Sequence, residues 1–331
     1  MTINVVEQVF RLTREFVRAH AVDALQGEIL DFALDTPQLE ELKAEPPVFV
    51  QIPLLVYGAI TGDYRPALPL CVVSTLLYCG ADILDDLADG ELAQRWARYD
   101  RRQAQLAAAT LLSALPQLAL AELQAAAQCR ALMHRTVASG LLAMAAGQVT
   151  DLAHCGLRHP DPERVELSVM RKSGEEVAMF AALAAQFAGA PPAVIEAYTE
   201  MGRAIGTAGQ ISSDCYDLFQ ARHSSDLASG ARTLPIAFYL TTRSPAECEE
   251  LLRLMAAGVN GNGGIQAIRG RLHGAGVLRM CAFVIELHRG RALKLLAAVE
   301  PTEPAACELR GLIDKLSLFP KPIAVSKGEA I

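Results

Sequence analysis

An all-α fold is the architecture that this sequence of 331 residues predicts. Alanine and leucine dominate it and aromatic residues make up only 5%, a balance that favours helices over sheets. No segment shows a sustained alternation of apolar and polar residues, and no Asn-Gly or Asp-Gly hairpin lies between β-branched runs. Because 52% of the residues are hydrophobic, we expect long helices packed around a large apolar core.

Helix breakers divide the chain into about ten helical segments. No linker between them is rich enough in Gly, Ser or Pro to separate domains, so residues 1–331 are expected to form a single domain. The tail from Phe319 onward is expected to be a loose end. The predicted breaks, in chain order, fall at residues 45–47, 61–63, 158–162, 189–192, 224–225 and 258–264.

Charge and cysteine usage exclude several classes of protein. A net charge of −7 and a pI near 5.6 leave no basic footprint for nucleic acid. The eight cysteines include no CxxC pair, which argues against a zinc site and a disulfide scaffold and fits a reducing cytoplasm. The N-terminus has no uninterrupted apolar run, so no signal peptide is expected. The apolar stretches Pro66–Ala81 and Leu106–Ala121 are predicted to be core helices, not membrane spans.

The most informative feature is a stripe of four acidic residues within an apolar run. Asp82, Asp85, Asp86 and Asp89 have the spacing i, i+3, i+4, i+7, which places all four on one face of a helix. Like charges this close repel one another, and burying them without compensation is costly. Divalent cations with oxygen ligands would neutralise them, and Mg²⁺ points to a phosphate-bearing substrate.

A second acidic pair, Asp214 and Asp217, lies much further along the chain, again with helical spacing in an apolar context. Two acidic faces can oppose each other across a helical bundle and build a metal site. Cationic and polar groups that would accompany a metal-bound phosphate also stand in or beside predicted helices. These residues are Arg95, Lys172, Arg232, Gln148 and Asp151.

Asp85–Asp86–Leu87–Ala88–Asp89 resembles the first DDxxD motif of the polyprenyl (isoprenyl) diphosphate synthase family. The resemblance covers roughly residues 55–240 and includes further motifs in the family's order. It implies an all-α isoprenoid synthase fold in which two aspartate motifs face each other across a deep apolar cavity. The further motifs are Arg65–Pro66, Gly147–Gln148–Val149–Thr150–Asp151, Lys172–Ser173–Gly174, Gln210, and Arg232–Thr233–Leu234–Pro235.

The resemblance also implies roles for individual residues. Three Mg²⁺ would hold an allylic diphosphate, with Asp85, Asp89 and Asp214 as metal ligands and with Asp86 and Asp217 supporting them. The diphosphate would contact Arg95, Lys172, Gln210 and Arg232. The pocket for the prenyl tail, with room for a chain of about fifteen to twenty carbons, would involve Leu77, Tyr78, Gly80, Ala81, Gln148 and Asp151. Gly80 and Ala81 are equally consistent with close packing of a neighbouring helix. The family further suggests a homodimer.

The site for the second substrate departs from the family pattern. Gly62 and Asp63 stand where elongating members carry a Lys and an Arg that bind isopentenyl diphosphate, and Gln94 stands in place of one Arg of a pair. These changes remove positive charge where a polyanion would bind. The sequence therefore favours an enzyme that ionises one allylic diphosphate and cyclises it or eliminates to a terpene. Asp82 has no place in the family motif.

Three alternatives stay open. The first is a chain-elongating synthase that uses Arg98, Arg101 or Arg102 for the second diphosphate. The second is a prenyltransferase that acts on a peptide acceptor. The third is a non-catalytic subunit of a heteromeric synthase, an alternative that Ser213 at the first position of the second motif favours slightly.

Overall fold

The computed structural model describes residues 3–35, 46–90, 92, 94–221, 224–256 and 262–319, and the regular elements within these residues are helices. The all-α prediction is therefore confirmed. In chain order the helices are α1 (Ile3–His20), α2 (Ala24–Ala33), α4 (Val48–Thr61), η1 (Arg65–Ala67), α5 (Leu68–Asp89), η2 (Gln94–Arg98), α6 (Arg101–Leu112), α7 (Ala114–Glu122), α8 (Ala127–His154), α9 (Pro162–Val169), η3 (Met170–Gly174), α10 (Glu175–Phe187), α11 (Pro192–Phe219), α12 (Ser225–Ser229), α13 (Leu234–Thr242), α14 (Pro245–Ala256), α15 (Asn262–Gly274), α16 (Val277–Ala298) and α17 (Ala305–Asp314).

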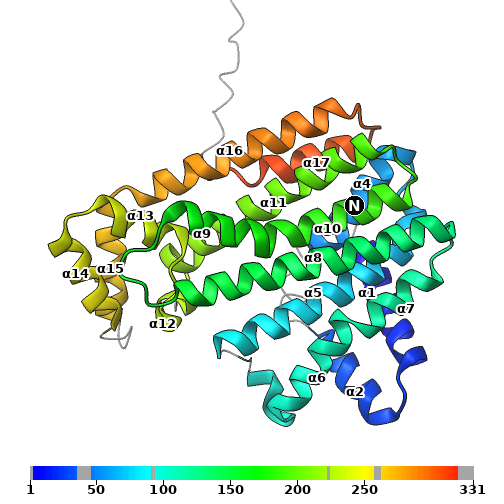
Figure 1. Cartoon of the computed structure of the whole chain (residues 1–331), viewed down its shortest axis with the longest axis horizontal. Helices are drawn as coiled ribbons and strands as arrows, with labels where there is room; N and C mark the ends of the chain where they lie inside the picture. Colours follow the sequence, from blue (N-terminus) through cyan, green and yellow to red (C-terminus); the bar gives the residue numbers. More distant parts are fainter. Residues whose placement is uncertain are drawn as a thin grey trace, which may run out of the picture.

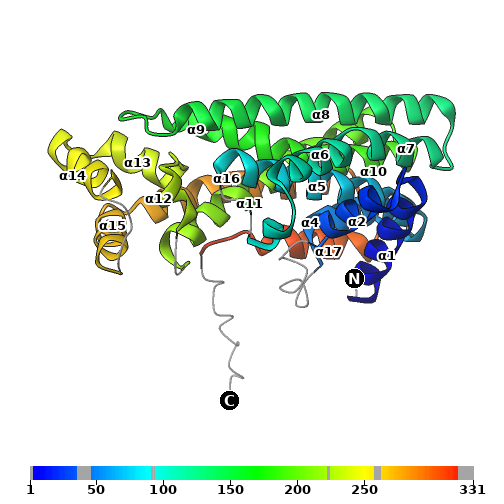
Figure 2. The ribbon, with the colours of Figure 1, turned by 90° about the horizontal axis from the view of Figure 1, so that it is seen from below.

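Long helices run along the length of the molecule and define its shape. Figure 1 shows α8, the α9–α10 segment, α11 and α16 extended along the long axis, with α12 to α15 gathered at one end and α1, α2, α6 and α7 near the other. Figure 2 shows α8 along one edge. Helix α10 packs on α11, α4 and α8, while α5 packs on α6, α1 and α4. These two helices are central because apolar residues surround them, and every residue from Val177 to Gln186 is buried.

The helices are more numerous and shorter than the breakers predicted. Between residues 63 and 158 the chain forms η1, α5, η2, α6, α7 and α8. Gly90 ends α5 in the left-handed conformation at φ 77°, and the side chain of Asp100 caps the start of α6. The predicted break at 258–264 is wrong at its end, because α15 already begins at Asn262. The predicted loose end lies outside the described residues from Pro320 onward.

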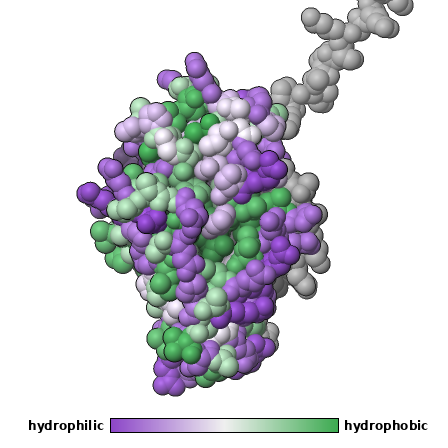
Figure 3. Space-filling view, turned by 90° about the vertical axis from the view of Figure 1, so that its right-hand side faces the viewer, coloured by the Kyte–Doolittle hydropathy of each residue, from purple (hydrophilic) through white to green (hydrophobic). Residues whose placement is uncertain are grey.

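Two stretches are long and apolar enough to cross a membrane by length and composition alone, Arg65–Ala88 and Arg101–Glu122. Within the fold, 67% and 44% of their apolar windows are buried. The first stretch contains α5 and serves as a core helix. The face in Figure 3 mixes apolar and polar side chains without a continuous apolar belt.

Glycines let three helices approach one another closely around η3. A Cβ on Gly206 of α11 would lie 2.3 Å from the carbonyl oxygen of Ser173, and one on Gly147 of α8 would lie 2.6 Å from the amide nitrogen of Lys172. Real Cβ atoms do not approach backbone this closely, so a side chain at either position would push the helices apart. The two glycines thereby fix the position of the π-helical turn that carries Lys172.

We predict that Gly206→Ala destabilises the protein by about 3 kcal/mol, because the new methyl group overpacks against backbone that cannot move aside. Urea denaturation measures the change. Gly209→Ala is the matched control on the same helix, since nothing lies within 4 Å of its added Cβ. The control is expected to gain up to about 1 kcal/mol from higher helix propensity. Equal effects of both substitutions would contradict the close approach.

Candidate active site

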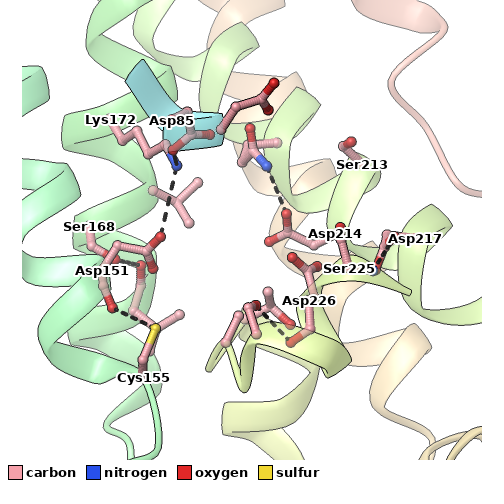
Figure 4. Close-up of a pocket in the computed structure, with 17 residues that line it drawn as sticks. Asp85, Asp151, Cys155, Ser168, Lys172, Ser213, Asp214, Asp217, Ser225 and Asp226 are labelled. Carbon is pink, nitrogen blue, oxygen red and sulfur yellow. Dashed lines mark hydrogen bonds and ion pairs between the residues drawn. The ribbon is translucent and has the colours of Figure 1, made fainter. Parts of the chain in front are cut away.

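Carboxylates from distant parts of the chain line one cavity of about 290 Å³. Asp85 and Asp86 come from the last turns of α5, and Asp214 and Asp217 from the last turns of α11. In Figure 4, Asp85, Lys172 and Asp151 lie on one side of the cavity and Asp214 on the other. The full lining is Asp85, Asp86, Asp151, Cys155, Val165, Ser168, Val169, Lys172, Gln210, Ser213, Asp214, Asp217, Ser225, Asp226, Ser229, Ala231 and Thr233.

Lys172 connects the carboxylates on its side of the cavity. Its Nζ donates a hydrogen bond to Oδ1 of Asp85 at 2.6 Å and lies 3.9 Å from Oδ2 of Asp151. Burial raises the pKa of Asp151, while the charge of Lys172 opposes the rise. Lys172 is the one basic side chain in the described lining, against six carboxylates. The cavity therefore carries a large excess of negative charge.

A hydrogen-bonded chain orients Asp214 on the opposite side. The hydroxyl of Ser173 donates to Oε1 of Gln210 at 2.9 Å, and Nε2 of Gln210 donates to Oδ1 of Asp214 at 2.8 Å. Burial raises the pKa of Asp214 to about 7, and although the bond from Gln210 opposes this rise, the nearby charge of Asp151 adds to it. The buried carboxylate therefore favours a cation beside it.

We predict that the metal-free protein loses stability as the pH rises from about 4 to about 7. The pKa of Asp214 is raised from 3.8 to about 7 in the folded chain, so its ionisation opposes folding over this interval. Asp214→Asn should remove on the order of 3 kcal/mol of this loss. Urea denaturation in a chelator at pH 5 and pH 8 measures it. An unchanged difference between the two pH values in the variant would contradict the assignment.

Asp217 is bound to the chain that follows it. The hydroxyl of Ser224 donates to its Oδ2 at 2.5 Å, and the backbone N–H of Ser225 donates to its Oδ1 at 3.3 Å. Ser224 also caps α12, because its Oγ accepts from the N–H of Leu227. Asp217 thus holds α12 against the cavity, and this helix supplies Asp226 to the lining.

Arg232 is placed differently from the sequence-based expectation. Its Nε donates to the carbonyl oxygen of Leu157 at 2.7 Å, and its Nη1 donates to that of Gly230 at 2.7 Å. Its neighbours Ala231 and Thr233 line the cavity instead. Successive side chains of an extended segment point in opposite directions, so Arg232 points away from the cavity. It helps to shape the loop and is not positioned to contact a diphosphate.

The side chains of Asp89 and Arg95, two further predicted site residues, lie outside what the structure describes. Asp226 is the acidic lining residue that sequence reasoning missed. Its sequence signal was its place just after the predicted break at 224–225, within the first turn of a capped helix. The serines of the lining carried no comparable signal.

The residues predicted for the tail pocket are largely packed in the core. Leu77 is 1% exposed, and Tyr78 stacks on Phe49 with ring centroids 4.2 Å apart. A Cβ on Gly80 would lie 2.8 Å from Cγ of Leu112, so Gly80 permits close packing of α5 on α6. The described cavity lining includes none of Leu77, Tyr78, Gly80 or Ala81. Gln148 is likewise outside that lining, whereas Asp151 belongs to it.

The donor set of the cavity fits a hard divalent cation. Carboxylate oxygens are the ligands that Mg²⁺ prefers, and the single ammonium group leaves most of their charge unbalanced. Within the described part of the chain, no three Asp, Glu, His or Cys side chains converge closely enough to hold one metal ion. Asp85 is in contact with Lys172 instead.

An all-α fold with two acidic helix ends facing across a cavity defines the class of isoprenoid synthases, and the solved structures that resemble the chain agree. A geranylgeranyl pyrophosphate synthetase from Pyrococcus horikoshii Ot3 superposes with a TM-score of 0.81 at 18% identity, covering 96% of this chain and 99% of its own. A geranylgeranyl pyrophosphate synthase from Corynebacterium glutamicum, complexed with isoprenyl diphosphate and magnesium, gives 0.80 at 17%, covering 95% and 98%. A Caulobacter crescentus CB15 polyprenyl synthase with calcium and isoprenyl diphosphate gives 0.77 at 19%, covering 95% and 94%.

The sequence matches the Polyprenyl synthetase family over residues 51–269. The chain belongs to this family, which confirms the resemblance drawn from its motifs. It is an enzyme of the prenyltransferase type. No curated protein sequence matches the chain significantly.

Proposed function

We propose that this enzyme binds an allylic prenyl diphosphate and Mg²⁺ in the aspartate-lined cavity and ionises the substrate there. The observation that carries the proposal is the lining itself, six carboxylates and one lysine brought together mainly by α5 and α11. Three Mg²⁺ are expected. The metal, when bound, neutralises the departing pyrophosphate and so lowers the barrier to breaking the allylic C–O bond.

The protein's own side chains have distinct roles in this step. Asp85 and Asp214 would hold the cation, and the Ser173–Gln210 pair keeps the carboxylate of Asp214 oriented. Lys172 presents its ammonium group to the cavity between Asp85 and Asp151. When a diphosphate enters with its metal, this ammonium group can contact a phosphate oxygen and stabilise charge that develops on the leaving group.

The sequence favoured cyclisation of the allylic cation, whereas the comparisons favour chain elongation. The similar solved structures are named as geranylgeranyl pyrophosphate or polyprenyl synthases. On this first candidate function, the cation adds to isopentenyl diphosphate and the product is a longer prenyl diphosphate.

We further propose that the enzyme works as a homodimer in the cytoplasm, and light scattering of the purified chain tests its oligomeric state.

Cyclisation or elimination is the second candidate, and the surroundings of Arg65 support it. Asp63 accepts two hydrogen bonds from the Arg65 guanidinium, each at 2.9 Å, so the one remaining cation of this region is already neutralised. Gly62 ends α4 at φ 84°, a conformation that a lysine side chain would strain.

The cations proposed as substitutes also have partners within the chain. Arg98 lies 3.6 Å from Glu28 and over the ring of Phe32. Arg101 donates to the carbonyl oxygen of Leu87. Arg102 donates to Asp100 at 2.9 Å. A second diphosphate would have to displace these contacts, which weakens binding of a second polyanion.

The test is a series of incubations of purified protein with Mg²⁺ and geranyl, farnesyl or geranylgeranyl diphosphate, each with and without isopentenyl diphosphate. Longer diphosphates establish elongation, and hydrocarbons formed without the second substrate establish the terpene synthase. Asp63→Asn removes the charge that pairs with Arg65. The rate of elongation should then increase several-fold, the effect expected from releasing one exposed ion pair. Absence of pyrophosphate release from every substrate would refute the proposed ionisation.

A further inference from the structure

A second layer of polar side chains lies one helical turn from the first, on the same three elements. Asp82 precedes Asp85 by three residues on α5, and Gln148 precedes Asp151 by three on α8. Glu176 follows Lys172 by four residues where η3 continues into α10. Residues three or four apart on a helix share one face, so each member of the first layer has a counterpart on its own element.

On each of the three elements, the second-layer residue lies closer to the core than its first-layer counterpart. Helix α5 enters the core at Leu76 and Leu77, which are buried, and its aspartates lie toward its exposed C-terminal end. Helix α8 runs antiparallel to the η3–α10 segment, because Gly147 lies against Lys172 while Gly140 lies against Met179. The second layer is therefore the deeper one, between the aspartate-lined cavity and the apolar interior.

The acids of this layer act on one another electrostatically. Burial raises the pKa of Glu176 to about 8, and the charges of Asp82 and Asp85 add to the rise. Helices α5 and α10, which carry Asp82 and Glu176, pack together, so the two carboxyl groups lie within electrostatic range of each other. Glu176 therefore serves as a carboxyl donor near neutral pH, and Asp82 is the carboxylate of the pair.

The side-chain amide of Gln148 is a second, independent indication that a small polar molecule is bound in this layer. Both polar atoms of its side-chain amide are buried, and neither finds a hydrogen-bond partner in the described part of the chain. Gln148 belongs to the inner stripe of α8, which includes the partly buried Leu141 and Met144 of the core and the cavity residues Asp151 and Cys155. A buried amide without partners is rare, and a water molecule commonly satisfies it.

We propose that Asp82, Gln148 and Glu176 hold a water molecule beneath the metal layer, and that this water captures the allylic cation to give a prenyl alcohol. The inference rests on the proposed ionisation. The allylic C–O bond breaks and its electron pair leaves with pyrophosphate. A lone pair of the water oxygen then forms the new C–O bond, and the proton passes to the carboxylate of the pair.

The chemistry of the layer fits water better than an apolar group. Water donates and accepts hydrogen bonds, so it serves the amide N–H, the amide oxygen and a carboxylate together. The position one turn below Asp85 lies directly beneath the cavity in which the first layer would hold the diphosphate. A held water molecule at this place competes with any other acceptor for the cation.

The test measures two quantities in ¹⁸O-labelled water with Mg²⁺ and farnesyl or geranylgeranyl diphosphate. Pyrophosphate release reports ionisation, and mass spectrometry reports the share of product that is prenyl alcohol with ¹⁸O on carbon. Asp82→Asn, Glu176→Gln and Gln148→Leu should each lower that share on the order of tenfold, the effect of one lost hydrogen bond, and in Glu176→Gln pyrophosphate release should stay within about threefold. Glu196→Gln, an exposed acid on α11, is the control and should change neither quantity.

The outcomes separate the inference from the proposed function. Pyrophosphate release without labelled alcohol, or an unchanged alcohol share in all three variants, would overturn the water site and leave ionisation intact. A parallel fall of both quantities would assign the acids to ionisation and also overturn it. Thermal melting of the variants separates function from folding, because a lower melting temperature in both acid variants would reveal a merely structural role.

Discussion

Asp85→Asn lowers the rate of pyrophosphate release from an allylic diphosphate by about a thousandfold, the effect expected when a principal electrostatic contact to the transition state is lost. The substitution keeps the shape of the side chain and removes its charge. Asp85 lies at the cavity, and its carboxylate is both the proposed metal ligand and the partner of Lys172 at 2.6 Å. Steady-state release measured over a range of Mg²⁺ concentrations gives the loss and its metal dependence.

Two controls accompany this variant. Glu196→Gln removes an exposed carboxylate from α11 at no cost to the cavity, and its rate should match that of the unmodified enzyme. Circular dichroism establishes that Asp85→Asn is folded. A rate within threefold of the unmodified enzyme, with the same Mg²⁺ dependence, would show that Asp85 does not hold the metal.

Lys172→Met has the second large effect, a loss of about a hundredfold in pyrophosphate release, because the described lining then holds no positive side chain. Methionine preserves the length of the chain and its packing. In the absence of metal the variant should also lose about 1–2 kcal/mol of stability, since Asp85 and Asp151 lose their shared partner. The loss is small because the side chains of Lys172 and Asp85 are 24% and 38% exposed, so solvent screens the pair.

Adding Mg²⁺ should restore most of that stability, because a bound cation takes over the neutralisation of the carboxylates. Urea denaturation with and without Mg²⁺ measures the recovery. Lys294→Met, on α16 away from the cavity, is the matched control and should not respond to the metal. If Mg²⁺ stabilises the Lys172 variant no more than this control, the cavity does not bind the ion.

Much of the site could be predicted from spacing alone. Asp85 and Asp86 follow an apolar helical run, and helical geometry requires their side chains to lie on neighbouring faces. The same argument holds for Asp214 and Gln210, which are four residues apart and form a hydrogen bond at 2.8 Å. Such local relations depend on the 3.6-residue period, which the sequence displays directly.

The direction of a side chain in an extended segment could not be predicted in this way. Arg232 next to Thr233 looked like a diphosphate contact, yet one residue of register decides that Ala231 faces the cavity and Arg232 faces the backbone of Leu157. The role of Gly80 could not be predicted from the sequence either. Whether a small residue opens a pocket or admits a neighbouring helix depends on where α6 lies, and α6 lies against it.

The sequence by itself determined that this protein is helical, that its acids form two helical stripes, and that its motifs are those of the polyprenyl synthetase family. Those properties are periodic or local, so neighbouring residues encode them. The tertiary structure alone decided which groups meet. Glycines that let α8 and α11 close on η3 place Lys172 beside Asp85, and packing buries the side-chain amide of Gln148 with no hydrogen-bond partner among the described residues. Contacts between helices far apart in the chain depend on packing, which no local pattern specifies.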